Sequence, residues 1–356
     1  MANVDTTPID PWLQLLWDRK GSDLLLSAGS APRLRLDGSL VLVEAESNLT
    51  PDKVGNAIRS LLLPEQFESF EKQKDFDFSF SWNNVARIRG NAFHQRGSPA
   101  LELRMIPMRI PSFEELALPA IVSSLANLPR GFVLVTGPTG SGKSTTLASI
   151  IDYINDNRPV HVLTIEDPIE YLHHHKRSII NQREIGVDSP SFERGLHAAL
   201  REDPDVLLIG EMRDLESIQI ALTMAETGHL VFATLHTYDA PQAIDRVIDV
   251  FPADRKDLIR IQMAGSLAAV IAQRLVNRVD GGRVGAFEVL LANSACRALV
   301  REGKTHQLRN VITTSRADGM QTLETNLIEL IGSGTISYET ALEVSMYPKD
   351  LARAMA

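Results

Sequence analysis

The sequence has a single cysteine and no long apolar run. Cys296 alone excludes a disulfide framework and any four-cysteine zinc site, and it fits a reducing compartment. No segment approaches the roughly 18–20 consecutive apolar residues that a membrane span needs. Residues 1–5 show neither the basic segment nor the apolar run of a secretion signal. We therefore expect a cytoplasmic protein with no direct insertion into a membrane.

An excess of positive charge is also missing. The 356 residues include 36 Lys and Arg against 45 Asp and Glu, a formal net charge of −9, and only 6% are aromatic. A nucleic-acid translocase would need basic loops with aromatic side chains along its channel, so we expect no nucleic acid as a partner. Hydrophobic residues make up 44%, enough for well-packed cores, and the length favours two domains.

The sequence does contain a phosphate-binding loop. Residues 137–145 match G-x-x-x-x-G-K-[ST] at every fixed position, after an apolar run at 131–136 and before a helical stretch at 145–155. In this strand, loop and helix context, backbone N–H groups at the start of the helix cradle an anion. Lys143 would reach the β- and γ-phosphates of ATP, and the Ser144 hydroxyl would bind Mg²⁺. We assign nucleotide binding to Gly137, Pro138, Thr139, Gly140, Ser141, Gly142, Lys143, Ser144 and Thr145.

The chain divides near residue 110 into two parts with different patterns. Residues 1–106 alternate short helices and strands, as in a small α+β domain, and the proline-punctuated segment 107–118 is expected to be a linker. Residues 119–356 start with apolar runs separated by helical stretches, which is typical of a parallel sheet with crossover helices. These expected strands are at 132–135, 160–165, 205–209 and 230–235. The expected helices beyond residue 255 are at 256–276, 294–302, 320–332 and 337–345.

Two acidic motifs follow expected strands of the second part. In residues 163–170, the carboxylates of Glu166, Asp167 and Glu170 could each orient or deprotonate an attacking water, and the residues alone do not choose among them. In residues 205–214, a strand ends at Gly210, which would let the chain approach a nucleotide closely. Glu211 follows it in the manner of a Walker B carboxylate, which holds Mg²⁺ or its coordinating water.

Two histidines flank the expected strand at 230–235. His236 closes a strand that should neighbour the phosphate-loop strand, so it is a candidate sensor of the γ-phosphate, whereas His229 comes before the strand. Metal binding by this pair is disfavoured because no third ligand lies at a recognisable spacing. The run His173–His175 is interpreted as an exposed loop, and the same ligand count disfavours metal binding there.

These motifs, at 137–145, 163–170, 205–214 and 227–237, resemble the Walker A, Asp box, Walker B and His box of the secretion ATPase superfamily. Within it the chain is most similar to the retraction ATPases of type IV pili, as the segments 91–93 and 303–307 indicate. The four-cysteine zinc motif of the assembly ATPases is impossible with one cysteine. Residues 203–205 and 210–214 favour the retraction ATPase over its accessory PilU-like relative.

The resemblance implies an N-terminal PAS-like domain, a C-terminal RecA-like domain with a helical C-terminal part, and a homo-hexameric ring that binds ATP between the domains. It also implies roles for particular residues. Glu170 matches the general base and Glu211 the Walker B glutamate, so Ser144 and Glu211 would hold Mg²⁺. His229 and His236 match the His box. Arginines inserted from the first domain make Arg87, Arg89 and Arg104 candidates for phosphate contact.

The function that the resemblance implies is ATP hydrolysis that powers pilus retraction, and hence pilus disassembly and twitching motility. The partners would be an inner-membrane platform protein (PilC-like) and PilU-like or assembly ATPases. The protein would be cytoplasmic and peripheral to the inner membrane through the pilus machinery. Alternatives are a PilU-like accessory ATPase, a RecA-like nucleic-acid translocase and a non-hydrolysing nucleotide switch. Intact Lys143, Glu170 and Glu211 argue against the switch.

The chain departs from its relatives at two places. His197 stands where they commonly carry an arginine, which would weaken a subunit contact there or make it pH-sensitive. In the retraction motif at 295–302, Cys296 replaces an isoleucine and Ala298 an asparagine, while Arg297 and Arg301 persist.

Overall fold

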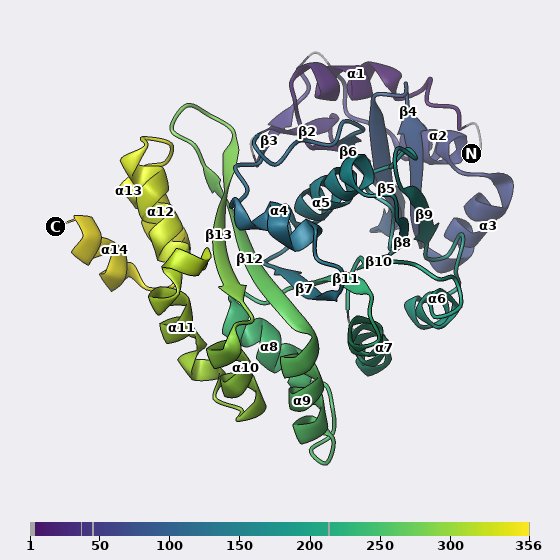
Figure 1. Ribbon diagram of the computed structural model, residues 1–356. Helices are drawn as coiled ribbons and strands as arrows, with labels where there is room; N and C mark the ends of the chain where they lie inside the picture. The colour runs from purple at the N-terminus through teal and green to yellow at the C-terminus, as the bar shows by residue number, and fades with distance from the viewer. Residues whose placement is uncertain (1–3, 37, 45, 213, 356) are drawn as a thin grey trace. The chain divides into compact units, whose positions relative to one another are not determined.

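The computed structural model describes residues 4–36, 38–44, 46–212 and 214–355 (Figure 1). The chain forms two compact units, each with its own sheet. The first comprises Met1–Arg109 together with Glu170–Leu172, and the second comprises Ile110–Ile169 and His173–Ala356. The expected mixed α/β fold with a parallel sheet is confirmed, because the second unit carries such a sheet.

The first unit is built on a six-stranded antiparallel sheet with the order β3-β2-β1-β6-β5-β4. Its strands are β1 (Asp23–Ser27), β2 (Arg33–Leu36), β3 (Ser39–Leu42), β4 (Asp75–Trp82), β5 (Ala86–Gln95) and β6 (Ser98–Pro107), and its helices are α1 (Asp10–Asp18), α2 (Pro51–Leu61) and α3 (Pro64–Gln73). Alternation along the strands places Leu24, Leu26 and Leu103 in the core with the helices. Asp23 and Arg104 therefore lie on the opposite face.

The second unit is built on a seven-stranded sheet with the order β13-β12-β7-β11-β10-β8-β9. Its strands are β7 (Gly131–Thr136), β8 (His161–Glu166), β9 (Ile179–Glu184), β10 (Val206–Ile209), β11 (Leu230–Leu235), β12 (Leu267–Asn277) and β13 (Arg283–Leu291). Only β13 runs antiparallel to its neighbour. The four strands expected before residue 255 are present as β7, β8, β10 and β11.

Helices cover both faces of this sheet (Figure 1). One core contains the apolar side chains of α4 and α5, and another, on the other face, contains those of α6 to α11. Apolar residues buried on both sides of the strands explain why β7 and β10 have no polar alternation. The helices are α4 (Ile121–Ala126), α5 (Lys143–Asn157), α6 (Phe192–Ala199), α7 (Leu215–Glu226), α8 (Ala240–Asp249), α9 (Lys256–Ser266), α10 (Ser294–Arg301), η1 (Thr305–Gln307), α11 (Leu308–Thr314), η2 (Arg316–Asp318), α12 (Leu323–Gly332), α13 (Tyr338–Val344) and α14 (Pro348–Met355).

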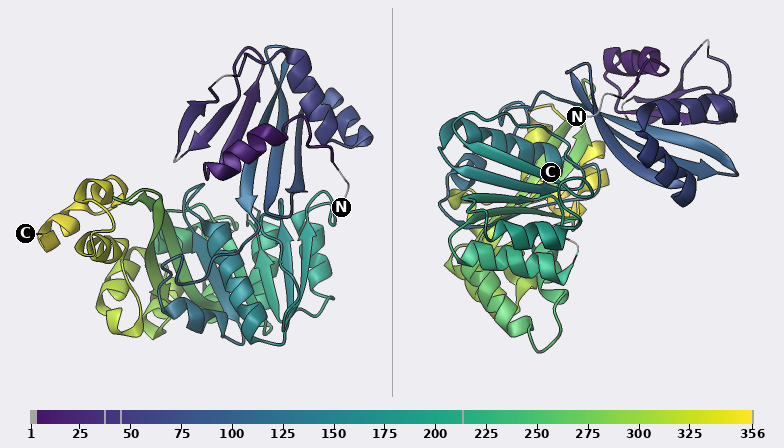
Figure 2. Two further views of the ribbon diagram at one scale, coloured as in Figure 1. Left: turned by 90° about the horizontal axis from the view of Figure 1, so that it is seen from above. Right: turned by 90° about the vertical axis from the view of Figure 1, so that its right-hand side faces the viewer.

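The prediction of one helix over 256–276 is wrong. Helix α9 ends at Ser266, and the chain continues directly into the strand β12. Figure 2 shows β12 and β13 as long green strands beside the yellow helices α12 and α13, which pack against them. Most of β12 is buried, so its apolar run could not be distinguished from a buried helix by periodicity.

None of the helices in the described ranges reaches the length and hydropathy required of a membrane span.

Candidate nucleotide-binding site

The phosphate loop joins the end of β7 to the first turn of α5, and its three glycines all have a positive φ, +77° at Gly140. Gly137 has a φ of +150° and Gly142 a φ of +88°, which L side chains rarely adopt. A Cβ on Gly137 would also lie 2.3 Å from the carbonyl oxygen of Gln273 on β12. These two glycines let the loop turn tightly against the neighbouring strand.

The interior of the loop is suited to an anion. Lys143 is only 9% exposed, and its Nζ donates to the carbonyl oxygens of Gly137, at 2.7 Å, and Pro138, at 3.1 Å. The buried Ser141 hydroxyl has no hydrogen-bond partner within the described ranges. An ammonium, an orphaned hydroxyl and the N–H groups at the start of α5 are the groups that would surround a phosphate, so the residues fit a nucleotide.

His236 and Glu211 meet at the same edge of the sheet as the loop. Strand β11 lies between β7 and β10 and is parallel to both, so the carboxyl ends of the three strands are adjacent. The expectation that β11 neighbours the phosphate-loop strand is therefore confirmed. Nε2 of His236 is 3.0 Å from Oε1 of Glu211. The hydroxyls of Thr136 and Thr237, 2.7 Å apart, join the end of β7 to the end of β11.

His229 lies at the other edge of the sheet, because it precedes β11 whereas His236 follows it. Seven residues of extended chain span about 23 Å. Its Nδ1 is 2.8 Å from the carbonyl oxygen of Met224 at the end of α7. The structure therefore brings His236 to the loop but does not bring His229 there.

The carboxylates of the Asp box are placed differently from one another. Oε1 of Glu166, at the end of β8, accepts hydrogen bonds from Thr164 Oγ1, at 2.6 Å, and Gln182 Nε2, at 3.1 Å. Gly210 lies against this strand end, where its Cβ would be 3.2 Å from the Cα of Glu166. Glu170 groups with the first compact unit rather than with the unit that carries the loop.

The three candidate arginines share one face of the antiparallel sheet. Arg89 on β5 is directly opposite Arg104 on β6, and Arg87 is two residues before Arg89 on the same strand. Arg87 is 8% exposed and donates to Ser79 Oγ at 2.6 Å. Nε of Arg104 is 2.8 Å from Oδ1 of the buried Asp23, so an internal carboxylate already pairs with its charge.

One residue that lies against the loop could not be assigned from the sequence. Gln273 on β12 is 4% exposed, and its Oε1 accepts a 2.7 Å hydrogen bond from Oγ1 of Thr146 in α5. It lies in the segment that was predicted to be helical. The amide that ends the apolar run 267–272, just before Arg274, was the available signal.

Comparisons with known proteins identify relatives of the whole chain. A family model described as "Type II/IV secretion system protein" matches residues 108–281. The chain is 47% identical over 332 residues to the "Type IV pilus retractation ATPase PilT" of Pseudomonas aeruginosa, covering 92% of this chain and 95% of that protein. It is 40% identical over 340 residues to the "Type IV pilus ATPase PilU" of the same organism, covering 95% and 89%.

A solved structure is similar over nearly the whole chain. The crystal structure of the pilus retraction motor PilT with bound ADP has a TM-score of 0.87 and 44% sequence identity to it, and the match covers 96% of this chain and 98% of that chain. Because the identity is this high over this length, the chain belongs to the PilT family of type II/IV secretion system ATPases.

Proposed function

We propose that this protein is an ATP-hydrolysing motor that powers the retraction of type IV pili. The observation that carries the proposal is the phosphate loop with the His236–Glu211 pair beside it, in a chain that matches an ADP-bound retraction motor almost end to end. Identity to PilT exceeds identity to PilU, which favours the retraction motor over the accessory ATPase.

In this proposal the loop residues 137–145 hold the nucleotide. Its N–H groups, Lys143 and Ser141 surround the phosphates, and the hydroxyl of Ser144 and the carboxylate of Glu211 supply the oxygen ligands that Mg²⁺ prefers, directly or through water. Bound Mg²⁺ would offset negative charge on the phosphates. His236, held by Glu211, stands beside the γ-phosphate and responds to its loss.

The catalytic base of the proposal is Glu170, which would orient and deprotonate the attacking water. Arg87, Arg89 and Arg104 of the first unit would add positive charge to the phosphates, and Arg104 would have to share its charge with Asp23. Hydrolysis would then change how the two units are held to the nucleotide. His229 is left without a role in binding the nucleotide of its own chain.

At a larger scale we propose a PAS-like first unit over residues 1–106, a linker at 107–118 and a RecA-like ATPase unit over 119–356. Six chains would form a ring, peripheral to the inner membrane, and act on a PilC-like platform protein, with PilU-like or assembly ATPases as further partners. Motion passing around the ring would withdraw pilin subunits and support twitching motility.

The test is ATP turnover by the purified protein with its mass measured by light scattering. We expect turnover by a hexamer, lost in Glu170→Gln and largely kept in Glu166→Gln, since Glu166 is bonded to Thr164 and Gln182. Turnover kept in Glu170→Gln and lost in Glu166→Gln would reassign the base. Tight ATP binding without turnover in the wild type would contradict the motor and leave a nucleotide-gated binding protein.

A further inference from the structure

The phosphate loop packs against β12, a strand that carries none of the recognised motifs. Strand β12 lies beside β7, on the side away from β11, with Ala272 opposite Thr136. The next residue, Gln273, is therefore level with the first residue of the loop. Its position suits it to act on the loop from behind, away from Glu211 and His236.

Gln273 lies against the loop at two places and bonds to the helix that follows it. Its backbone oxygen lies under Gly137, 2.3 Å from where a Cβ would be, and its Nε2 lies 2.9 Å from the corresponding position at Gly142. Its Oε1 accepts the hydrogen bond from Thr146, in the first turn of α5. Thr146 also donates its backbone N–H to the carbonyl oxygen of Gly142, at 3.0 Å.

Both partners of the side-chain bond are buried, at 4% exposure for Gln273 and 1% for Thr146. A hydrogen bond between two buried groups is costly to break, because the group left behind loses its partner and cannot reach water. This bond therefore fixes the distance between β12 and the first turn of α5. That turn begins with Lys143 and carries the N–H groups that would hold the phosphates.

We propose that Gln273 is a positioning residue for nucleotide binding, which holds the loop in its phosphate-binding shape through Thr146. In this role Gln273 acts through Thr146 and not on the phosphates. The inference rests on the proposed function, since it assigns a part in the same site. Without the bond, the loop spends part of its time in shapes that do not bind, and apparent affinity falls in proportion.

The test is a double-mutant cycle on the full-length chain. Gln273→Met removes the amide at nearly constant volume, Thr146→Val removes the hydroxyl, and a fluorescent ATP analogue reports the dissociation constant. We expect each single variant to weaken binding about three- to tenfold, the range for one hydrogen bond. The double variant should bind the analogue no more weakly than the single variant with the larger dissociation constant, because both changes remove the same bond.

Gln321→Met is the matched control. Its amide donates to the carbonyl oxygen of Phe287, at 3.0 Å, and has no part in the loop. It should lower the melting temperature without changing nucleotide affinity. If Gln273→Met fails to fold, Thr146→Val alone still tests the bond from the other side.

Two results would overturn the inference. One is a lower melting temperature with unchanged nucleotide affinity in Gln273→Met and Thr146→Val, which would mean that the bond supports the fold alone. The other is full additivity in the double variant, which would mean that the two side chains act separately. A wild-type chain that binds no ATP would instead refute the proposed function.

Discussion

Burial of single titratable residues gives this protein a pH dependence of stability that can be assigned to named side chains. His173, expected in an exposed loop, is half-buried, and the burial of its ring lowers its pKa to about 4, with Asp152 opposing the shift and Lys176 adding to it. A histidine that stays neutral when folded and protonates when unfolded costs stability as pH falls.

We therefore expect His173 to stabilise the fold fully above pH 6.5 and to lose this contribution as the pH falls towards 4. Between pH 7 and pH 5, the wild type should lose about 2 kcal/mol more unfolding free energy than His173→Gln. Urea denaturation of both proteins at the two pH values measures the difference. Equal losses would mean that His173 is hydrated in the folded chain.

Glu288 should act in the opposite direction. It is 8% exposed, and burial raises its pKa to about 7, opposed by the hydrogen bond from the Ala240 N–H and reinforced by the nearby Asp239 and Glu324. A folded-state pKa above the unfolded value gives stability that is present below pH 4.5 and is lost as pH rises through 7.

The expected result is a loss of roughly 2 to 3 kcal/mol in the wild type between pH 5 and pH 8 that Glu288→Gln does not show, since glutamine carries no proton to lose. Denaturation curves at the two pH values provide the comparison. A variant that follows the wild type over this range would place the pH dependence on other groups.

At the scale of elements, Arg297 explains part of the retraction motif as a helix cap. Its guanidinium donates to the carbonyl oxygens of Ala264, Gly265 and Leu267 at the end of α9, and to that of Ala292. The last carbonyls of a helix have no partner within the helix, so one side chain on α10 satisfies several of them.

Arg297→Lys keeps the charge but loses the planar fork that reaches these oxygens, so we expect it to destabilise the fold by about 2 kcal/mol. The control is Arg301→Lys, at an exposed position on the same helix. Its free energy of unfolding should stay within about 0.5 kcal/mol of the wild-type value. Denaturation of both variants measures the two free energies of unfolding that are compared. Equal effects would mean that the cap contributes little.

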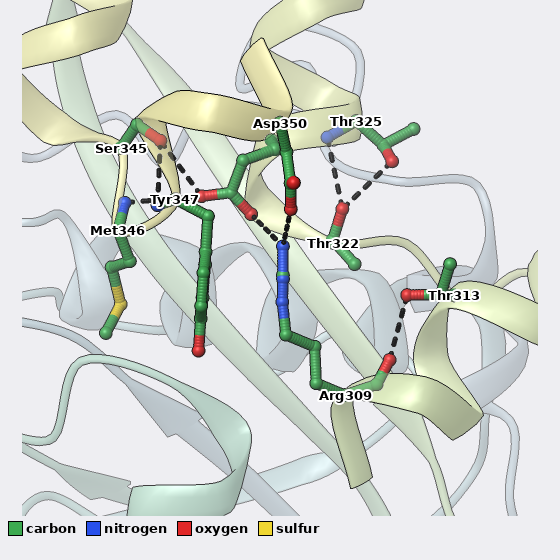
Figure 3. A network of polar contacts seen from close by, with 9 residues as sticks. Arg309, Thr313, Thr322, Thr325, Ser345, Met346, Tyr347 and Asp350 are labelled. Atoms are coloured by element: carbon green, nitrogen blue, oxygen red, sulfur yellow. Dashed lines mark hydrogen bonds and ion pairs between the residues drawn. The ribbon is translucent and has the colours of Figure 1, made fainter. Parts of the chain in front are cut away.

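Glu324 on α12 holds the C-terminal segment in a similar way. Its Oε1 accepts hydrogen bonds from Ser345 Oγ and the N–H groups of Met346 and Tyr347, at 3.1 to 3.2 Å, while Oε2 is 3.2 Å from Arg309. Figure 3 shows Arg309 alongside the ring of Tyr347, with the guanidinium carbon 3.5 Å from the ring centroid, and Nη2 of Arg309 is 2.7 Å from Oδ2 of Asp350.

We expect Glu324→Ala to release this segment, with the amides of Met346 and Tyr347 exchanging hydrogen about tenfold faster, since one lost bond is worth about 1 kcal/mol or more. The matched control is Glu329→Ala on the same helix as Glu324. It removes an exposed ion pair between Glu329 and Arg316. Unchanged exchange in Glu324→Ala would show that packing of the C-terminal helices suffices.

The elements that the sequence predicted well are those with one dominant signal. The strands β7, β8, β10 and β11 are short apolar runs bounded by turns. The glycines of the loop, followed by Lys143 and Ser144, match the phosphate-binding pattern at every fixed position. Strand β9 was missed because its residues, Ile179–Glu184, are mostly polar at the sheet edge. Helix α3 gives little signal in the sequence, because only Phe70 of its ten residues is buried.

Site residues that are close together in the sequence could be predicted. Those that are brought together by the order of the strands could not. Lys143 and Ser144 could be assigned from spacing alone. The pairing of His236 with Glu211 needed β10 beside β11, an order that the sequence did not specify. Gln273 required both the strand β12 and its place beside β7, and the Asp23–Arg104 pair required the register of the first sheet.

At the scale of the whole molecule, the two units have separate cores that can be followed independently. The chain has three tryptophans, and all lie in the first unit: Trp82 in its core, and Trp12 and Trp17 packed against it. Tryptophan fluorescence therefore reports unfolding of the first unit alone. Circular dichroism reports mainly the larger second unit, which carries the phosphate loop and most of the helices.

These two signals test whether nucleotide binding involves the first unit. A non-hydrolysed ATP analogue at about 100 times its dissociation constant should add roughly 3 kcal/mol to the unit that binds it, raising the circular dichroism midpoint. If Arg87, Arg89 and Arg104 contact the phosphates as proposed, the fluorescence midpoint should rise as well. Arg89→Gln should then reduce the fluorescence shift more than the circular dichroism shift. A fluorescence midpoint that the nucleotide leaves unchanged would contradict the arginine contacts, while the loop in the second unit would remain the binding site.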